Sequence, residues 1–121
     1  MNPFSTKATG LREPELITFD NTNNLTDNSI GQPVIVSGKM TVSLAPNGSK
    51  FDGFVSSIDK KSVTVQIEGS FESAYSGNVP SYGRDTLASD GNGAIKKDVG
   101  GDVFLVLSID TNAKRVSFIR L

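Results

Sequence analysis

The chain lacks both cysteine and histidine among its 121 residues. Without cysteine, neither a disulfide framework nor a thiolate metal site can form. Without histidine, the commonest metal ligand and the commonest general base are missing. We therefore expect a protein that is not an enzyme and that has no catalytic residue, no cofactor and no metal site.

An excess of basic charge and a long apolar run are also missing. The chain has 12 lysines and arginines against 13 aspartates and glutamates, a net charge of −1, so it lacks the basic footprint of a nucleic-acid binder. No apolar run approaches the roughly 20 residues that cross a membrane, and the first residues contain no apolar signal core. These absences predict a protein made in the cytoplasm, with neither nucleic acid nor membrane as a partner.

The clearest pattern that is present predicts an antiparallel hairpin over residues 51–71. Apolar and polar residues alternate in its second half, which is typical of a half-buried strand. The polar residues 59–62 separate the two halves, and a four-residue loop there keeps the apolar residues of both halves on one face. The expected buried face consists of Phe54, Ile58, Val63, Val65 and Ile67.

The rest of the chain predicts further short strands and no helix. We expect strands at 16–19, 33–36, 40–44, 86–88, 94–96, 103–107 and 116–121, with turns at intervals near 8–12 residues. Residues 103–107 are apolar on both parities, which is typical of a strand covered on both faces, whereas 69–84 is expected to be a loop. This pattern predicts an all-β fold, either a small antiparallel β-sandwich or a partly closed barrel.

The first 15 residues differ from the rest. They are polar, contain Pro3, Gly10 and Pro14, and show no periodicity. We expect residues 1–15 to form an extended N-terminal arm and residues 16–121 to form a single β domain.

Two loops invite a ligand interpretation that their spacing does not support. In residues 20–31, which are rich in Asn and Asp, an EF-hand would need Gly at the sixth position and Glu at the twelfth, where this chain has Leu25 and Gly31. Residues 90–97 lack the spacing of a phosphate loop. An ordinary Asx-rich turn is the better interpretation of the first loop, and a hairpin turn is the better interpretation of the second. Acidic pairs such as Glu68 with Glu72 or Asp85 with Asp90 are expected by chance among 13 acidic residues.

Five aromatic residues, at 51, 54, 71, 75 and 82, could form a stacking platform for single-stranded nucleic acid. Such a platform also needs a basic groove, and Phe51 and Phe54 are better interpreted as core. Tyr75 and Tyr82 fall in the expected loop, where tyrosines either anchor an interface or pack the loop on its own sheet. Both alternatives stay open.

Several glycine-centred motifs follow one another in a recognisable order. They are GQPV at 31–34, GFV at 53–55, VQIEG at 65–69 and LASDGNG at 87–93, followed by a strand, Asp110 and a final strand. This order resembles that of the small all-β capsid decoration (cement) proteins of tailed bacteriophages. The likeness extends from residue 31 to residue 121, with one departure: three residues, where the family has two, separate Gly83 from Leu87.

The resemblance implies a non-enzymatic structural protein of a virion. Such a protein binds the outer surface of the phage head, bridges neighbouring major capsid protein subunits and stabilises the capsid against the pressure of its DNA. It also implies a homo-oligomer, with a trimer suspected. A polar arm that orders on binding would add contact area. The expected contact residues are Phe4, Leu11, Arg12, Leu16, Tyr75 and Tyr82.

Two other functions remain as alternatives. One is a tail or fibre-base β-domain of a virion, which uses the same strand chemistry. The other is a small β-barrel module that binds nucleic acid or carbohydrate.

Overall fold

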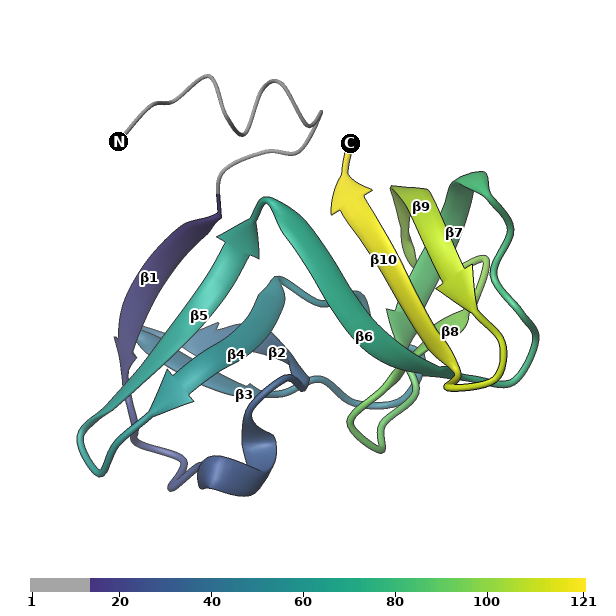
Figure 1. Ribbon diagram of the computed structural model, residues 1–121. Helices are drawn as coiled ribbons and strands as arrows, with labels where there is room; N and C mark the ends of the chain where they lie inside the picture. Colours follow the sequence, from purple (N-terminus) through teal and green to yellow (C-terminus); the bar gives the residue numbers. More distant parts are fainter. Residues whose placement is uncertain (1–13) are drawn as a thin grey trace, which may run out of the picture.

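The computed structural model describes residues 14–121, and their regular secondary structure is almost entirely β-strand (Figure 1). The strands are β1 Glu15–Asp20, β2 Pro33–Gly38, β3 Thr41–Leu44, β4 Gly53–Ile58, β5 Ser62–Glu68, β6 Ser70–Ser76, β7 Gly83–Ser89, β8 Ile95–Lys97, β9 Asp102–Asp110 and β10 Arg115–Arg120. One 3-10 helix, Asp27–Ser29, interrupts the loop after β1. The predicted all-β fold is confirmed. Within residues 14–121, no helix is long and apolar enough to cross a membrane.

The strands close into two small barrels that follow one another along the chain. The first barrel has the strand order β1-β3-β2-β4-β5, and the second has the order β10-β6-β8-β7-β9. Both pair their first and third strands in parallel and all other neighbours antiparallel. If β1 is matched with β6, β2 with β7, and so on to β5 with β10, every pairing recurs. The second barrel therefore repeats the topology of the first.

A short sequence repeat marks the same duplication. The last hairpin of each barrel contains V-x-S-I-D, as Val55–Asp59 in the first barrel and Val106–Asp110 in the second. Both aspartates hold their hairpin turns in the same way: Asp59 Oδ1 accepts hydrogen bonds from two turn N–H groups, and so does Asp110 Oδ1. This local use of aspartate is typical of turns.

The predicted hairpin at 51–71 is confirmed as β4 and β5, but the predicted buried face is wrong in one residue. The register shifts between Val55 and Ser57, so one residue of β4 is unpaired as in a β-bulge. The bulge reverses the side-chain parity of β4. Val55 and Ile58 therefore face inward with Val63, whereas Phe54 faces outward. Phe54 is nonetheless buried, because the second barrel covers it.

Two hydrophobic clusters fill the molecule. The smaller lies inside the first barrel and contains Phe19, Val34, Val42, Val55, Val63 and Val65. The larger lies inside the second barrel, but residues of the first barrel enter it. Those residues are Ala45, Phe51 and Phe54, from the segment between β3 and β4 and from the start of β4.

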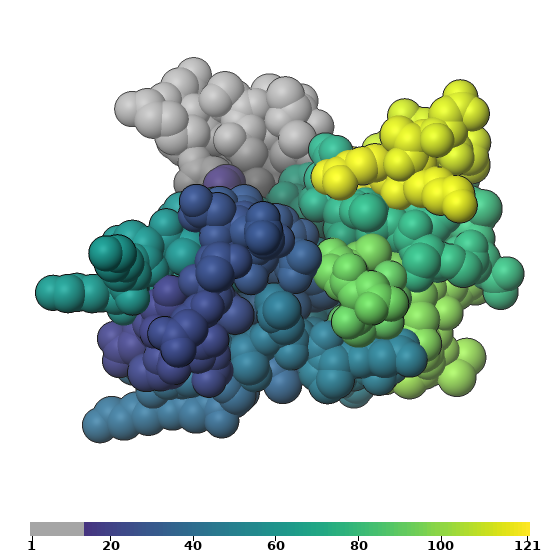
Figure 2. Space-filling model, turned by 90° about the horizontal axis from the view of Figure 1, so that it is seen from below, coloured from purple at the N-terminus to yellow at the C-terminus, as the bar shows by residue number. Residues whose placement is uncertain are grey.

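Aromatic rings form the junction between the barrels. The Phe54 ring of the first barrel lies with its centroid 5.1 Å from that of Phe71 and 5.9 Å from that of Phe118, both from the second barrel. Such pairs contribute stability beyond the area they bury. Figure 2 shows the blue residues of the first barrel lying against the green residues of the second.

Backbone hydrogen bonds reinforce this junction. The Gly48 N–H donates to the Ser89 carbonyl at 2.8 Å, and the Ser89 N–H donates to the Ser49 carbonyl at 2.9 Å. The Ser89 hydroxyl also donates to the Ala45 carbonyl at 2.8 Å. The segment before β4 thus pairs with the end of β7 like a short extra strand.

Two expectations about individual segments are wrong. Residues 70–76 were expected in a loop, but they form strand β6, which pairs with β10. Phe71, Ser73 and Tyr75 are buried, and the residues between them are more exposed, which is the alternation of a strand. Residues 103–107 were expected to be covered on both faces, but only Phe104 and Val106 are buried. Val103 and Leu107 point out of the barrel and are 45% and 39% exposed.

The predicted N-terminal arm lies almost wholly outside the described residues. The first described strand begins at Glu15, one residue before the expected start of the β domain, a difference within the usual uncertainty of element boundaries. The single β domain expected over residues 16–121 stays a prediction. In the structure these residues form two barrels that share an aromatic core.

Candidate interaction site

The six expected contact residues fall into three situations. Phe4, Leu11 and Arg12 lie outside the described residues. Leu16 lies near the start of β1 and is 54% exposed. The two tyrosines differ from one another, and the structure places Leu16 and Tyr82 on different barrels.

Tyr75 is not an exposed loop residue, so its predicted position is wrong. It lies on β6 with its side chain inside the second barrel, where it is 5% exposed and belongs to the larger hydrophobic cluster. The inward parity of β6 buries the ring, since the buried residues Phe71 and Ser73 precede it at alternate positions. A burial this deep excludes Tyr75 as a contact residue of the folded chain.

Tyr82 keeps the properties of a contact residue. It ends the loop between β6 and β7 and is 67% exposed, and Val79 in the same loop is 49% exposed. Pro80, which lies between them, is buried. A tyrosine displayed on an ordered loop is a common interface anchor, because it offers a large area and a hydroxyl at little cost in conformational entropy.

Side-chain contacts fix the loop that carries Tyr82. The Ser81 N–H donates to Asp85 Oδ2 at 2.8 Å, and Lys97 Nζ donates to Ser81 Oγ at 2.7 Å. Lys97 Nζ also lies 3.4 Å from Asp85 Oδ2, and the Asp85 side chain is only 8% exposed. Side chains from two strands, β7 and β8, therefore hold the residue before Tyr82, and the ring is presented from a fixed position.

The neighbouring turn after β7 is held by Asp90. Its Oδ1 accepts from the N–H groups of Asn92 and Ala94 at 2.7 and 3.0 Å, and its Oδ2 accepts from Ser76 Oγ at 2.9 Å. Partial burial raises the pKa of Asp90, but these hydrogen bonds outweigh it and leave the pKa below its ordinary value. The residues at 90–93 thus form the predicted hairpin turn between β7 and β8, and the Asp90 side chain holds it as an Asx turn.

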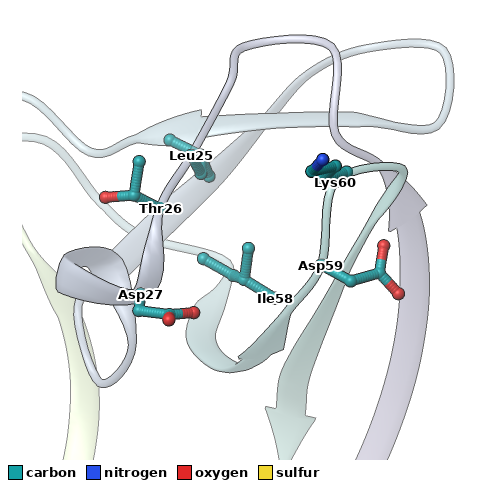
Figure 3. A pocket seen from close by; sticks show the side chains of 6 residues that line it. All are labelled: Leu25, Thr26, Asp27, Ile58, Asp59 and Lys60. Carbon is teal, nitrogen blue, oxygen red and sulfur yellow. The ribbon is translucent and has the colours of Figure 1, made fainter.

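A hollow on the surface lies elsewhere, on the first barrel (Figure 3). It is open, has a volume of about 450 Å³ and lies between the loop after β1 and the β4–β5 turn. Its lining residues are Leu25, Thr26, Asp27, Ile58, Asp59 and Lys60. The side chains in Figure 3 mix two apolar residues with two carboxylates and one ammonium group.

The polar groups around this hollow are already used by the fold. The Asn21 Nδ2 donates to the carbonyls of Leu25 and Asp59 at 3.0 and 2.9 Å, and Asn21 Oδ1 accepts from the Leu25 N–H at 2.8 Å. Hydrogen bonds from the N–H groups of Lys61 and Ser62 lower the pKa of Asp59. The hollow is therefore a place where a loop is tied to a hairpin.

No metal-binding or acid–base group stands out in the part of the chain that the structure describes. Among residues 14–121, no three Asp or Glu side chains gather closely enough to hold a metal ion. Glu72, one of the acidic residues considered for catalysis, lies on the surface with its Oε1 accepting from Arg115 Nε at 3.1 Å. Asp85 and Asp90 each hold a separate turn.

One exposed apolar feature was missed by the sequence interpretation. Val103 and Leu107 of β9 and Val99 in the preceding loop are 45%, 39% and 97% exposed. The apolar run at 103–107, on both parities, predicts a strand that the chain itself covers on both faces, whereas in the structure one of these faces is exposed. The V-x-S-I-D repeat was missed as well, and it would have indicated the duplicated fold.

No protein family model matches the sequence of this chain, and no curated protein has a significantly similar sequence.

Proposed function

We propose that this chain is a non-enzymatic structural protein that binds the outer surface of a tailed-phage head and stabilises contacts between major capsid protein subunits. The order of its glycine-centred motifs, which resembles that of the phage decoration proteins, supports this proposal. The observation that carries it is the presentation of Tyr82, 67% exposed on a loop fixed by Asp85 and Lys97. Such a fixed aromatic residue suits binding to a preformed surface, because little ordering is needed on contact.

Decoration also suits a small chain with modest individual contacts. Many copies on a repeating lattice make weak contacts effective, and a homo-oligomer multiplies them further. A trimer remains the oligomer that the family resemblance suggests, and the capsid surface remains the expected location.

Co-sedimentation tests the proposal. The purified chain is mixed with undecorated mature heads of the phage that encodes it, and the bound amount is measured against the free concentration. We expect binding that saturates at a fixed copy number per head. Tyr82→Ala should weaken it about 10- to 100-fold, since central aromatic contacts at interfaces contribute about 2 kcal/mol or more, while thermal stability stays unchanged.

A matched control separates this effect from a general loss of binding. Lys60→Ala changes an exposed side chain on the first barrel, so it should leave head binding unchanged. Absence of saturable binding to heads would overturn the proposal. Binding to tails would favour the tail or fibre-base alternative, and a salt-sensitive oligonucleotide shift or glycan binding that Tyr82→Ala abolishes would favour a binding module.

A further inference from the structure

The two barrels place equivalent residues in opposite environments. Ile17 of β1 and Phe71 of β6 are equivalent, because Ile17 pairs with Val65 on β5 and Phe71 pairs with Phe118 on β10. Phe71 is 2% exposed, whereas Ile17 is 39% exposed. The same position of the duplicated topology is therefore buried in the second barrel and exposed in the first.

The cover over Phe71 comes from the first barrel. The Phe54 ring lies with its centroid 5.1 Å from that of Phe71, and the segment before β4 pairs through Gly48 and Ser49 with Ser89 at the end of β7. One barrel thus uses the outer face of its fourth strand and the preceding loop to cover the other. In the second barrel, the covered residue Phe71 lies on β6, the first strand. The parallel pairing of β6 with β8, the third strand, is short and includes only Tyr75 and Ser76 of β6.

Within residues 14–121, no other element covers the same outer face of the second barrel. Leu105 is equivalent to Phe54, since each directly precedes the valine of the V-x-S-I-D repeat. Leu105 is half-buried, Val103 is 45% exposed and Val99 of the preceding loop is 97% exposed. We call Val99, Val103 and Leu105 the donor face.

The corresponding place on the first barrel is also left exposed by the described part of the chain, residues 14–121. β1 and β3 share a single bridge, Asp20 with Thr41. Ile17 and Leu44, whose parity on β1 and β3 is that of the inward-facing Phe19 and Val42, remain 39% and 43% exposed. Val36 of β2, which the strand registers make equivalent to the buried Leu87 of β7, is 49% exposed. We call Ile17, Val36 and Leu44 the acceptor face.

Charges beside the two faces are complementary. Arg84 lies directly across from Leu105 in the β7–β9 register and is exposed. Glu15 and Glu68 lie directly across from one another beside Ile17. Two like charges in such positions repel, so a cation brought to this end of the first barrel would be attracted.

We propose that the donor face of one copy of this chain packs on the acceptor face of a second copy, repeating between chains the contact that joins the barrels within one chain. Arg84 of one copy then lies near Glu15 and Glu68 of the next. The contact is heterologous, because two different surfaces meet, and such contacts close into rings or extend as chains. This contact between copies follows from the duplicated fold and does not require binding to phage heads.

Complementation between two face variants tests this contact in the isolated protein. Leu105→Asp disrupts the donor face, and Ile17→Asp disrupts the acceptor face. Each variant alone should self-associate at least about tenfold more weakly than wild type, so that it is monomeric by light scattering at concentrations where wild type associates. Mixed together, they should form a 1:1 heterodimer and nothing larger, because each retains the one face that the other lacks. Ile30→Asp, which changes a 47% exposed residue outside both faces, should associate like wild type.

Charge reversal gives a second test that does not place a charge in an apolar patch. Arg84→Glu should weaken self-association, and Glu68→Arg in the same chain should restore it. A wild-type chain that stays monomeric as its concentration rises would overturn the proposal. So would self-association of Ile17→Asp alone, since that result requires a contact that does not use the acceptor face.

Discussion

The ring of Phe51 stacks on the ring of Phe104, with centroids 5.2 Å apart and an interplanar angle of 5°. Phe51 lies two residues before the fourth strand of the first barrel, and Phe104 lies on the fourth strand of the second. Both rings are at most 1% exposed. This stack therefore makes the core of one barrel depend on a residue of the other.

Truncation of either ring should destabilise the protein strongly. Phe51→Ala and Phe104→Ala should each lower the free energy of unfolding by about 3–5 kcal/mol, because each leaves a cavity in a buried aromatic cluster. The double variant should cost less than the sum by about 0.5–1.5 kcal/mol, the coupling of a close aromatic pair. Urea unfolding of the four proteins measures this coupling, and strict additivity would show that the stack contributes nothing beyond buried area.

The shared core also predicts that both barrels unfold together. Both tyrosines lie in the second barrel and the chain has no tryptophan, so tyrosine emission reports on the second barrel alone. Circular dichroism at the β-sheet band reports on both barrels. We expect the two denaturation curves to coincide, as they do for a two-state domain. An earlier transition in either signal would show two independent domains.

Arg120 should contribute more to stability than its position on the last strand suggests. Its Nη2 donates to the carbonyls of Phe51 and Asp52 at 3.4 and 3.0 Å, and its guanidinium carbon lies 5.2 Å from the centroid of the Phe104 ring. Arg120→Ala should lower the free energy of unfolding by about 1–3 kcal/mol, since carbonyl groups lose a charged donor and the ring loses a cation.

Arg115→Ala is the matched control for that variant. Arg115 also lies on β10, but it pairs on the surface with Glu72, and the two side chains are 45% and 61% exposed. Such pairs contribute about 0–1 kcal/mol. Equal losses in the two variants would contradict the assigned role of Arg120 at the junction.

Stability should fall in acid as the turn aspartates become protonated. The pKa values of Asp59 and Asp98 lie below the ordinary range, mainly because backbone N–H groups donate to their carboxylates. The pKa of Asp90 is also lowered, by hydrogen bonds that outweigh its partial burial. Because these pKa values are lower in the folded than in the unfolded chain, the stabilisation is complete above the unfolded pKa of about 3.9 and is lost as the pH falls through the folded values.

Urea unfolding at a series of pH values from neutral to strongly acidic checks this dependence. Asp90→Asn should lose less stability on acidification than wild type, because it removes one of the groups whose protonation is linked to unfolding. Asp20→Asn changes an exposed aspartate and serves as the control. A pH dependence of Asp90→Asn identical to that of wild type would contradict the role of this carboxylate.

The local elements could be predicted from the sequence because their signals are local. Alternation in 62–68 and turn residues at 59–61 indicate the β4–β5 hairpin without any tertiary information. The side that Phe54 faces could not be predicted, since the bulge after Val55 that turns it outward leaves no mark in the apolar pattern. Tyr75 was misplaced for a related reason: its strand is made of Ser, Glu and Ala around two rings, a composition that resembles a loop.

The candidate site was predictable only in part. Tyr82 follows a Gly-Asn-Val-Pro-Ser segment that indicates a loop, but its fixed position depends on Lys97, which is distant in sequence. The donor face was hidden because periodicity reports which residues are apolar and cannot report which of them the chain leaves uncovered. Only the strand pairing within both barrels shows which apolar residues stay exposed.

The most direct test of the proposed function is cryo-electron microscopy of virions of the phage that, under this proposal, encodes the chain. We predict density for the paired barrels on the outer face of the head, at repeated positions between major capsid protein subunits, with Tyr82 directed to the shell. Density for the chain on the tail, or none on the head surface of virions that contain the chain, would contradict the proposal.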